Sequence, residues 1–259
     1  MLEYKLKEYI AAQKGSVAVV IKGLISGEEI HINENLPFPA ASTIKLAIMA
    51  ALLEGAAAGA LQLENMMELT ETMKTGGDGI LQSMESGRRF TLDELLEWMI
   101  VVSDNTAANI FIDLLGMESI NHTIKNMGLR DTSLQRKMMD FDAAAEGREN
   151  IITAKDLAQL LEWIYKGQLI SKQYSHKMLE ILKRQQVKGR LDLYLPGEVL
   201  IAHKAGDLDQ VEHDAGIVYL ENNEYILCVL TKNVESNEMG REIIGRISRL
   251  VYEAFLEKK

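Results

Sequence analysis

A serine and a lysine stand three positions apart at the start of an apolar stretch, in the run Ser42-Thr43-Ile44-Lys45. Residues three apart lie on one face of a helix, so this hydroxyl and this amine can meet. The positive end of the helix dipole favours a developing negative charge, and a lysine desolvated nearby loses proton affinity. The pair therefore indicates nucleophilic chemistry, although an N-cap serine beside a snorkelling lysine would have the same spacing.

A second polar group, Ser103-Asp104-Asn105, lies between two helical patterns. Side chains of all three types can cap the helix that is expected to begin near Thr106. Taken alone, this group therefore has a purely structural explanation.

A third group, Lys204-Ala205-Gly206, lies in an expected strand just before Asp207. A glycine in a strand often marks the close approach of a ligand or of another backbone. The neighbouring lysine would add a fixed positive charge, although a strand end with a surface lysine is also common.

The order and spacing of the three groups are more informative than each group alone. Ser-x-x-Lys, then Ser-Asp-Asn, then Lys-x-Gly is the motif set of serine β-lactamases and penicillin-binding proteins. Each group also lies in the context that this chemistry needs, namely a helix start, an inter-helix loop and a strand. The sequence resembles the class A β-lactamase family and its wider serine-hydrolase relatives over nearly the whole chain.

The resemblance implies a role for five side chains. Ser42 would be the nucleophile that forms an acyl-enzyme, and Lys45 would accept its proton or belong to the proton relay. Ser103 would pass a proton to the leaving nitrogen, and Asn105 would bind the amide of the substrate and help to order Lys45. Lys204 would add positive charge, which helps to keep Lys45 neutral and attracts an anionic substrate.

The same resemblance implies an oxyanion hole made by the backbone N–H groups of Ser42 and Asp207, and substrate contacts at Asn105, Ala205 and Gly206. Two such donors stabilise a transition state by several kcal/mol, about 3 kcal/mol each. The family usually has threonine or serine where this chain has Ala205. The hydroxyl that commonly binds the carboxylate of the substrate is therefore missing.

The long segment from Gly128 to Thr153 contains the second departure from the family pattern. Class A enzymes have a glutamate two residues after an arginine there, and it activates the water that releases the acyl group. The best register places Met138 at that position, after Arg136, and methionine cannot act as a general base. Asp140 is the first candidate for a substitute base.

From these motifs we expect a serine hydrolase that forms an acyl-enzyme on Ser42 with a β-lactam, an ester or a peptide-like amide. Release of the acyl group is expected to be slow because Met138 replaces the glutamate. The alternative is a penicillin-binding or sensor-type protein on the same fold that does not hydrolyse its ligand.

The elements that must position these residues predict an α+β fold. A helix and two strands open the chain, and three strands and a helix close it, with helical patterns between them. We expect one domain over 1–259, with a five-stranded antiparallel sheet and flanking helices from 1–40 and 197–259. An inserted helical lobe would occupy 41–196.

Composition excludes several other classes of protein. The net charge of −10 disfavours nucleic acid and membrane surfaces as partners. Cys228 is the only cysteine, and the histidines lack metal-ligand spacing, so we expect neither a cofactor nor a metal. The N-terminal run does not resemble a secretory signal, which indicates a cytoplasmic protein, or an exported one if the N-terminus is incomplete. The expected partner is a small-molecule substrate, and the sequence leaves the oligomeric state open.

Overall fold

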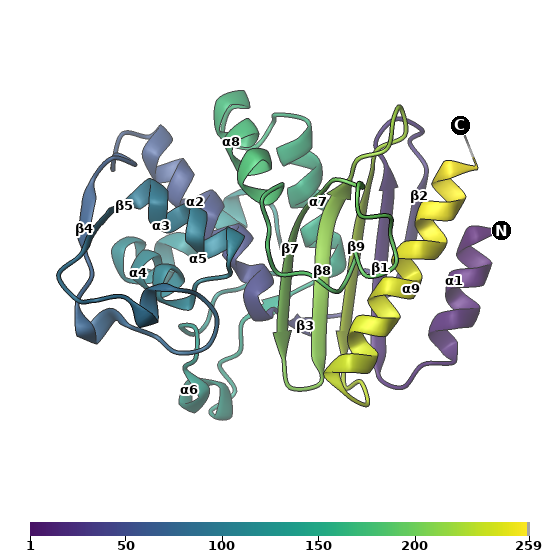
Figure 1. The fold of residues 1–259 in the computed structure, drawn as a ribbon, viewed down its shortest axis with the longest axis horizontal. Coiled ribbons are helices and arrows are strands. Elements are labelled where there is room, and N and C mark those ends of the chain that lie inside the picture. Colours follow the sequence, from purple (N-terminus) through teal and green to yellow (C-terminus); the bar gives the residue numbers. More distant parts are fainter. Residues whose placement is uncertain (258–259) are drawn as a thin grey trace.

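A five-stranded antiparallel sheet organises the chain, whose residues 1–257 are described by a computed structural model (Figure 1). The strand order is β2-β1-β9-β8-β7. The strands are β1 (Ser16–Gly23), β2 (Glu29–Ile32), β7 (Ile201–Leu208), β8 (Val211–Val218) and β9 (Tyr225–Lys232). This confirms the predicted fold class, with one sheet built from both ends of the chain.

The contact between the two parts of the sheet is the pairing of β1 with β9, in which Val20 faces Cys228. Side chains alternate between the two faces of a strand. Val19 accordingly packs into one apolar cluster and Val20 into another. The two clusters therefore lie on opposite faces of the sheet, which explains why its central strands are rich in valine and isoleucine.

Helices cover both faces of the sheet. On one face, α9 (Asn237–Leu256) packs on β8 and β9, and α1 (Leu2–Ala11) packs on α9 (Figure 1). On the other face, α7 (Ala154–Tyr165) contacts β1, β8 and β9. This helix lies within the range 41–196 that was expected to form the helical lobe, so that part of the chain also covers the sheet.

The remaining helices form the opposite end of the molecule (Figure 1). Its central helix, α2 (Lys45–Ala57), is buried from Lys45 to Leu53. Around it lie α3 (Leu92–Val101), α4 (Asn105–Leu115) and α5 (Met117–Asn126), whereas α8 (Lys172–Leu182) packs on α3, α7 and β7. Thr91 and Glu94 form a capping box at the start of α3.

The segment 128–153 contains more regular structure than its sequence suggested. It includes the short helix α6 (Phe141–Ala145) and the strand β6 (Ile151–Ile152), which pairs with β3 (Phe38–Pro39). A second small sheet joins β4 (Met66–Glu68) to β5 (Arg89–Thr91). Strands this short have no readable periodicity, so pattern analysis could not detect them.

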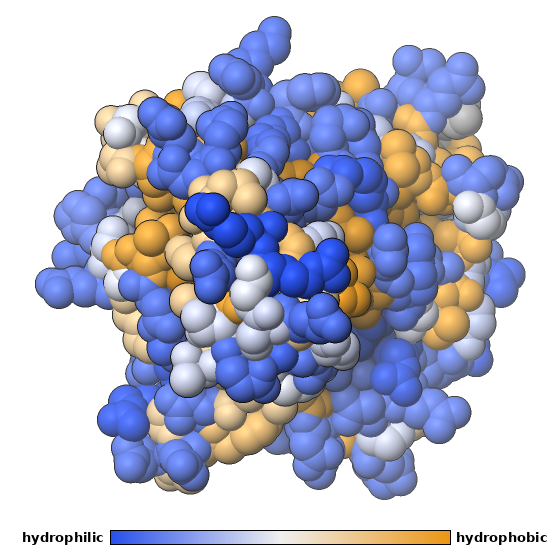
Figure 2. Space-filling view, turned by 60° about the vertical axis from the view of Figure 1, so that its left-hand side comes forward, coloured by the Kyte–Doolittle hydropathy of each residue, from blue (hydrophilic) through white to orange (hydrophobic). Residues whose placement is uncertain are grey.

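The surface over the helical end is mostly hydrophilic, with hydrophobic side chains in small separate groups (Figure 2). None of the helices within residues 1–257 combines the length and the apolar character needed to cross a membrane.

Candidate active site

Ser42 lies in a 3₁₀ turn, η1 (Ala41–Ile44), immediately before the first residue of α2, which is Lys45. The Nζ atom of Lys45 is 3.1 Å from the Oγ atom of Ser42. The spacing of three residues thus places the amine against the hydroxyl, as the first motif predicted. Lys45 is fully buried.

Three further contacts fix the amine of Lys45. Its Nζ atom is 2.6 Å from the carbonyl oxygen of Ser103, 2.7 Å from Oδ1 of Asn105 and 3.1 Å from Oγ of Ser103. The amide nitrogen of Asn105 donates to the carbonyl oxygen of Gly76, which is consistent with Oδ1 facing the lysine. The first two motifs therefore meet at one nitrogen atom.

The environment of Lys45 favours its neutral form. Burial holds the pKa of Lys45 well below its ordinary value, and the nearby charge of Lys204 lowers it further, against the opposing effect of Asp78 and other carboxylates. A neutral amine has two N–H groups and one lone pair. The carbonyl oxygens of Ser103 and Asn105 can only accept, so they take the two N–H groups and leave the lone pair for a hydroxyl such as that of Ser42.

Asp104, between Ser103 and Asn105, has the structural role that its type suggested. Its Oδ1 atom accepts from the backbone N–H of Ala107 and caps α4, while its Oδ2 atom accepts from the N–H groups of Ile80 and Leu81. The motif therefore contains both a helix cap and two residues that contact Lys45. The aspartate fixes the backbone, and its two neighbours face Lys45.

Lys204, on the edge strand β7, completes the group of side chains. Its Nζ atom is 3.1 Å from Oγ of Ser103 and 2.6 Å from the carbonyl oxygen of Ala205. Burial lowers the pKa of Lys204 to about 7, although Asp214 opposes this effect. The Ser103 hydroxyl therefore lies between two lysines and can exchange a proton with either.

Gly206 explains how β7 approaches Ser42 so closely. A Cβ atom at Gly206 would lie 2.6 Å from the backbone nitrogen of Ser42 and 3.0 Å from that of Thr43. Any side chain at this position would push the strand away from η1. The glycine of the third motif is thus required by backbone packing beside the candidate oxyanion hole, whose second N–H would come from Asp207.

Three residues of this site have an unfavourable backbone conformation. Ala41, Ser103 and Met139 all have positive φ angles, of 46°, 56° and 63°. Residues other than glycine seldom adopt this conformation, which costs of order 1 kcal/mol or more each, and it gathers at functional sites. Ala41 directly precedes the candidate nucleophile, Ser103 contacts Lys45, and Met139 lines the pocket.

A pocket of about 500 Å³ opens in front of Ser42. Its apolar wall consists of Met138, Met139 and Phe141, of which the last two are exposed to solvent. Asn105 and the end of β7 form other parts of the lining. The pocket is large enough for a small acyl donor.

Met138 lines this pocket and is held there by Asn109. The side-chain amide of Asn109 accepts from the backbone N–H of Met138 and donates to its carbonyl oxygen, at 2.8 and 3.1 Å. Asp140 does not line the pocket, and its carboxylate caps α6 by accepting from the N–H of Ala143. The structure therefore brings Met138, and not the candidate base Asp140, to the pocket.

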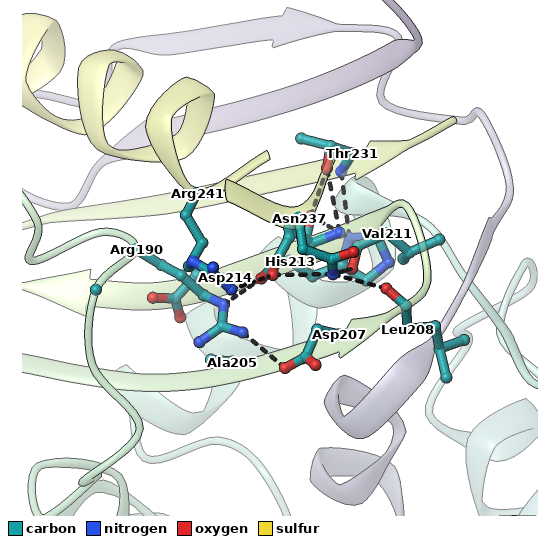
Figure 3. A network of polar contacts seen from close by, with 12 residues as sticks. Arg190, Ala205, Asp207, Leu208, Val211, His213, Asp214, Thr231, Asn237 and Arg241 are labelled. Atoms are coloured by element: carbon teal, nitrogen blue, oxygen red, sulfur yellow. Dashed lines mark hydrogen bonds and ion pairs between the residues drawn. The ribbon is translucent and has the colours of Figure 1, made fainter. Parts of the chain in front are cut away.

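An ion-pair network lies behind the end of β7 (Figure 3). Arg190, which is almost completely buried, donates to Oδ1 of Asp207 and to Oε2 of Glu212, both at 2.6 Å. Asp207 and Glu212 are direct partners in the pairing of β7 with β8. Like charges in such a pair repel, and the guanidinium between them offsets that repulsion.

Arg241 and Asn237 complete this network at Glu212, because both donate to its Oε1 atom, at 2.9 and 3.1 Å. Burial raises the pKa of the Glu212 carboxyl, while the charge of Arg190 and the amide of Asn237 act in the opposite direction. The buried carboxylate is thus fully provided with donors.

Several of these residues were missed in the sequence. Asn109 lies four positions after Asn105 on α4, and this spacing on one helix face could have revealed it. Arg190 and Asp78 lie in loops without periodicity, so no pattern connects them to β7 or to the pocket. Within residues 1–257, no group of three or more metal-ligating side chains is placed to hold an ion.

Comparisons with known proteins agree with this architecture. Residues 1–255 match the model of the Beta-lactamase enzyme family. The β-lactamase VEB-1 of Pseudomonas aeruginosa is 24% identical, over 99% of this chain and 91% of that protein. The fold and the sequence together define a serine hydrolase of the β-lactamase type. The chain belongs to the β-lactamase enzyme family.

Two solved structures are more similar in sequence. A β-lactamase from Sphaerobacter thermophilus is 32% identical, with a TM-score of 0.91 over 98% of this chain and 96% of that one. A variant of PBP-A, solved as an acyl-enzyme complex with penicillin G, is 29% identical, with a TM-score of 0.91 over 99% of this chain and 96% of that one. The chain is thus similar to proteins of both kinds that the motif set indicated.

Proposed function

We propose that this protein is a serine acyl-transfer enzyme whose nucleophile is Ser42. The observation that carries the proposal is the 3.1 Å contact between Ser42 Oγ and the buried amine of Lys45. In the proposed step, Oγ attacks the carbonyl carbon of the substrate, its proton passes to Lys45, and a bond from Oγ to that carbon forms. The substrate would be a β-lactam, an ester or a peptide-like amide.

Acylation is completed when the bond from the carbonyl carbon to the leaving atom breaks. Ser103 is positioned to give that atom a proton and to regain one from Lys45, because its hydroxyl is 3.1 Å from Lys45 Nζ. The N–H groups of Ser42 and Asp207 are the candidate donors to the oxyanion. Asn105 lines the pocket and could also bind an amide of the substrate.

We further propose that the acyl-enzyme is long-lived. Met138 lines the pocket, and the best sequence register assigns it to the position of the family's glutamate. A thioether cannot accept a proton from water. The same observation supports the second candidate function, a penicillin-binding or sensor-type protein that is acylated without turnover. The acyl-enzyme complex of the similar protein PBP-A with penicillin G is consistent with either candidate.

Time-resolved measurement of the intact protein mass tests both the nucleophile and the lifetime of the acyl-enzyme. Wild type and Ser42→Ala are incubated with penicillin G and with an activated phenylacetyl ester, and the adduct is followed after removal of excess reagent. A stoichiometric adduct that is absent from Ser42→Ala is the expected result. Equal labelling of both proteins, or none with either reagent, would refute the nucleophile, whereas rapid loss of the adduct would refute only its long life.

A further inference from the structure

The pocket in front of Ser42 is lined by three carboxylates, of which only that of Asp207 forms an ion pair among residues 1–257. Asp207 and Asp209 line it at the end of β7, and Asp78 lines it from the loop before η3 (Leu81–Ser83). Among residues 1–257, no cation pairs with Asp78 or Asp209 within 4 Å. A cleft lined by one sign of charge concentrates ligands of the opposite sign.

The cations near the pocket do not cancel this charge. Arg136 also lines the pocket, but its guanidinium binds both oxygens of Glu149, at 2.9 and 3.1 Å. The amines of Lys45 and Lys204 are fully buried and face Ser103. Neither amine lines the pocket, so the charged side chains of the lining are three carboxylates and one arginine that is already paired.

The end of β7 is also unsuited to a carboxylate ligand. Ala205 and Asp207 are two residues apart and therefore lie on the same face of the strand (Figure 3). Ala205 has no hydroxyl to donate, and the side chain of Asp207 is 43% exposed. Ala205 is buried and does not line the pocket, so a carboxylate at this end of the pocket would meet the carboxylate of Asp207 and no side-chain hydroxyl from β7.

Arg190 cannot supply the missing donor, because its guanidinium is committed to the protein. It donates to Asp207 and Glu212 at 2.6 Å, and only 5% of its side chain is exposed. Asp207 thus repels an anion, and it also binds Arg190, the nearest arginine, so that this guanidinium is not available to a ligand. Its replacement by a neutral side chain would reverse both effects.

We infer, on the basis of the function proposed above, that this site takes acyl donors whose leaving portion is a cation, such as an amine or a quaternary ammonium. Asp207 and Asp209 attract the cation at the end of β7. The acyl portion is apolar and packs on Met138, Met139 and Phe141. The leaving portion lies toward β7 because Ser103, the proton donor for the leaving atom, is bound there by Lys204.

Three thioesters with one acyl group test this inference. Phenylacetyl thioesters of 3-mercaptopropionate, 3-mercaptopropionamide and thiocholine carry an anionic, a neutral and a cationic leaving thiol. In each case Oγ of Ser42 forms the new bond to carbon, the carbon–sulfur bond breaks, and the thiolate departs with the electron pair. All three give the same adduct mass. Because the three thiols differ in intrinsic leaving ability, each acylation rate is divided by the rate of hydrolysis of the same ester by hydroxide without protein, and the corrected rates report contacts of the leaving portion with the site.

For wild type we expect the thiocholine ester to acylate Ser42 about tenfold or more faster than the mercaptopropionate ester, with the amide between them. Salt at about 0.5 M should reduce this ratio because it screens the exposed carboxylates. Asp209→Asn should reduce it severalfold. Asp207→Asn should reduce it further, since it removes a charge and also releases Arg190.

The matched control is Asp142→Asn, which removes one exposed carboxylate of α6 outside the pocket lining and should leave the ratio unchanged. An equal or faster rate with the mercaptopropionate ester would overturn the cationic preference while leaving the proposed nucleophile intact. A ratio that falls equally in Asp142→Asn and Asp209→Asn would also overturn it. No adduct with any of the three esters would overturn the proposed function and this inference together.

Discussion

The amine of Lys45 lies 3.1 Å from the hydroxyl of Ser42 and has no exposed surface. A buried lysine is costly unless its charge is lost or compensated. Here the two carbonyl acceptors and the lowered pKa of Lys45 provide for a neutral amine whose lone pair can face the hydroxyl. The proposed proton transfer requires a neutral amine next to Ser42, which gives a reason for burying this lysine despite the free-energy cost.

Removal of the Lys45 amine should slow acylation strongly. For Lys45→Met, a variant with an unbranched side chain of similar length, we expect the rate to fall by about 10²–10⁴, the usual contribution of a general base. The measurement is the rate of adduct formation by intact mass, with thermal unfolding to verify the fold. Lys183→Met, which removes a surface lysine, is the control. A rate within threefold of wild type would contradict the proton-acceptor role.

Lys204 should make stability depend on pH above neutrality. Its pKa is about 7 in the folded protein and near 10.5 in the unfolded chain, so the unfolded state binds more protons between these values. The free energy of unfolding should therefore rise from pH 7 to pH 9, by at most about 1.4 kcal/mol per unit from this group.

Urea unfolding of wild type and Lys204→Met at pH 7, 8 and 9 measures this effect. Lys45 has a lowered pKa and acts in the same direction, so the contribution of Lys204 is the difference between the two slopes. Parallel slopes for the two proteins would show that the pKa of Lys204 is not lowered.

A glutamate at position 138 should accelerate release of the acyl group. Met138 lines the pocket and its backbone is fixed by Asn109, so Met138→Glu places a carboxylate where water can reach it. We expect the adduct to decay about 10²-fold faster, the size of a typical general-base effect, with some loss of stability from the buried charge. Met139→Glu, whose side chain is exposed, is the matched control, and equal decay in both variants would refute the role of position 138.

Asp140→Asn tests whether the Asp140 carboxylate only caps α6 or also takes part in release of the acyl group. Asparagine caps a helix about as well as aspartate, so α6 should remain intact while the carboxylate is lost. Because that carboxylate caps α6 and lies outside the pocket lining, we expect the decay of the adduct to be unchanged. A clearly slower decay would establish Asp140 as the substitute base.

Gly206→Ala should weaken both the fold and the site. The new Cβ atom would lie 2.6 Å from the backbone nitrogen of Ser42, so β7 and η1 must separate. Overpacking of this kind costs roughly 1–3 kcal/mol, and displacement of the candidate oxyanion hole should slow acylation at least about tenfold. Gly197→Ala, which meets nothing within 4 Å, should change neither the unfolding free energy nor the acylation rate appreciably.

Residue spacing within one element was sufficient to predict the contact of Ser42 with Lys45, because helix geometry alone determines it. The strands and the antiparallel sheet also followed from local patterns. The pairing of Arg190 with Asp207 was beyond such reasoning, since it depends on how a loop crosses the end of β7. The sequence also did not show that the carboxylate of Asp140 caps α6, because that helix has only five residues.

The pairing of β1 with β9 has a consequence for synthesis on the ribosome. Val20 faces Cys228, so these two partners in the centre of the sheet are 208 positions apart in the chain. At ordinary translation rates this interval lasts roughly 10 to 40 s, during which the apolar strand β1 has only β2 beside it. The nascent chain therefore carries an unpaired strand edge for most of its translation, and Ser42 can meet Lys204 only after that interval is nearly over.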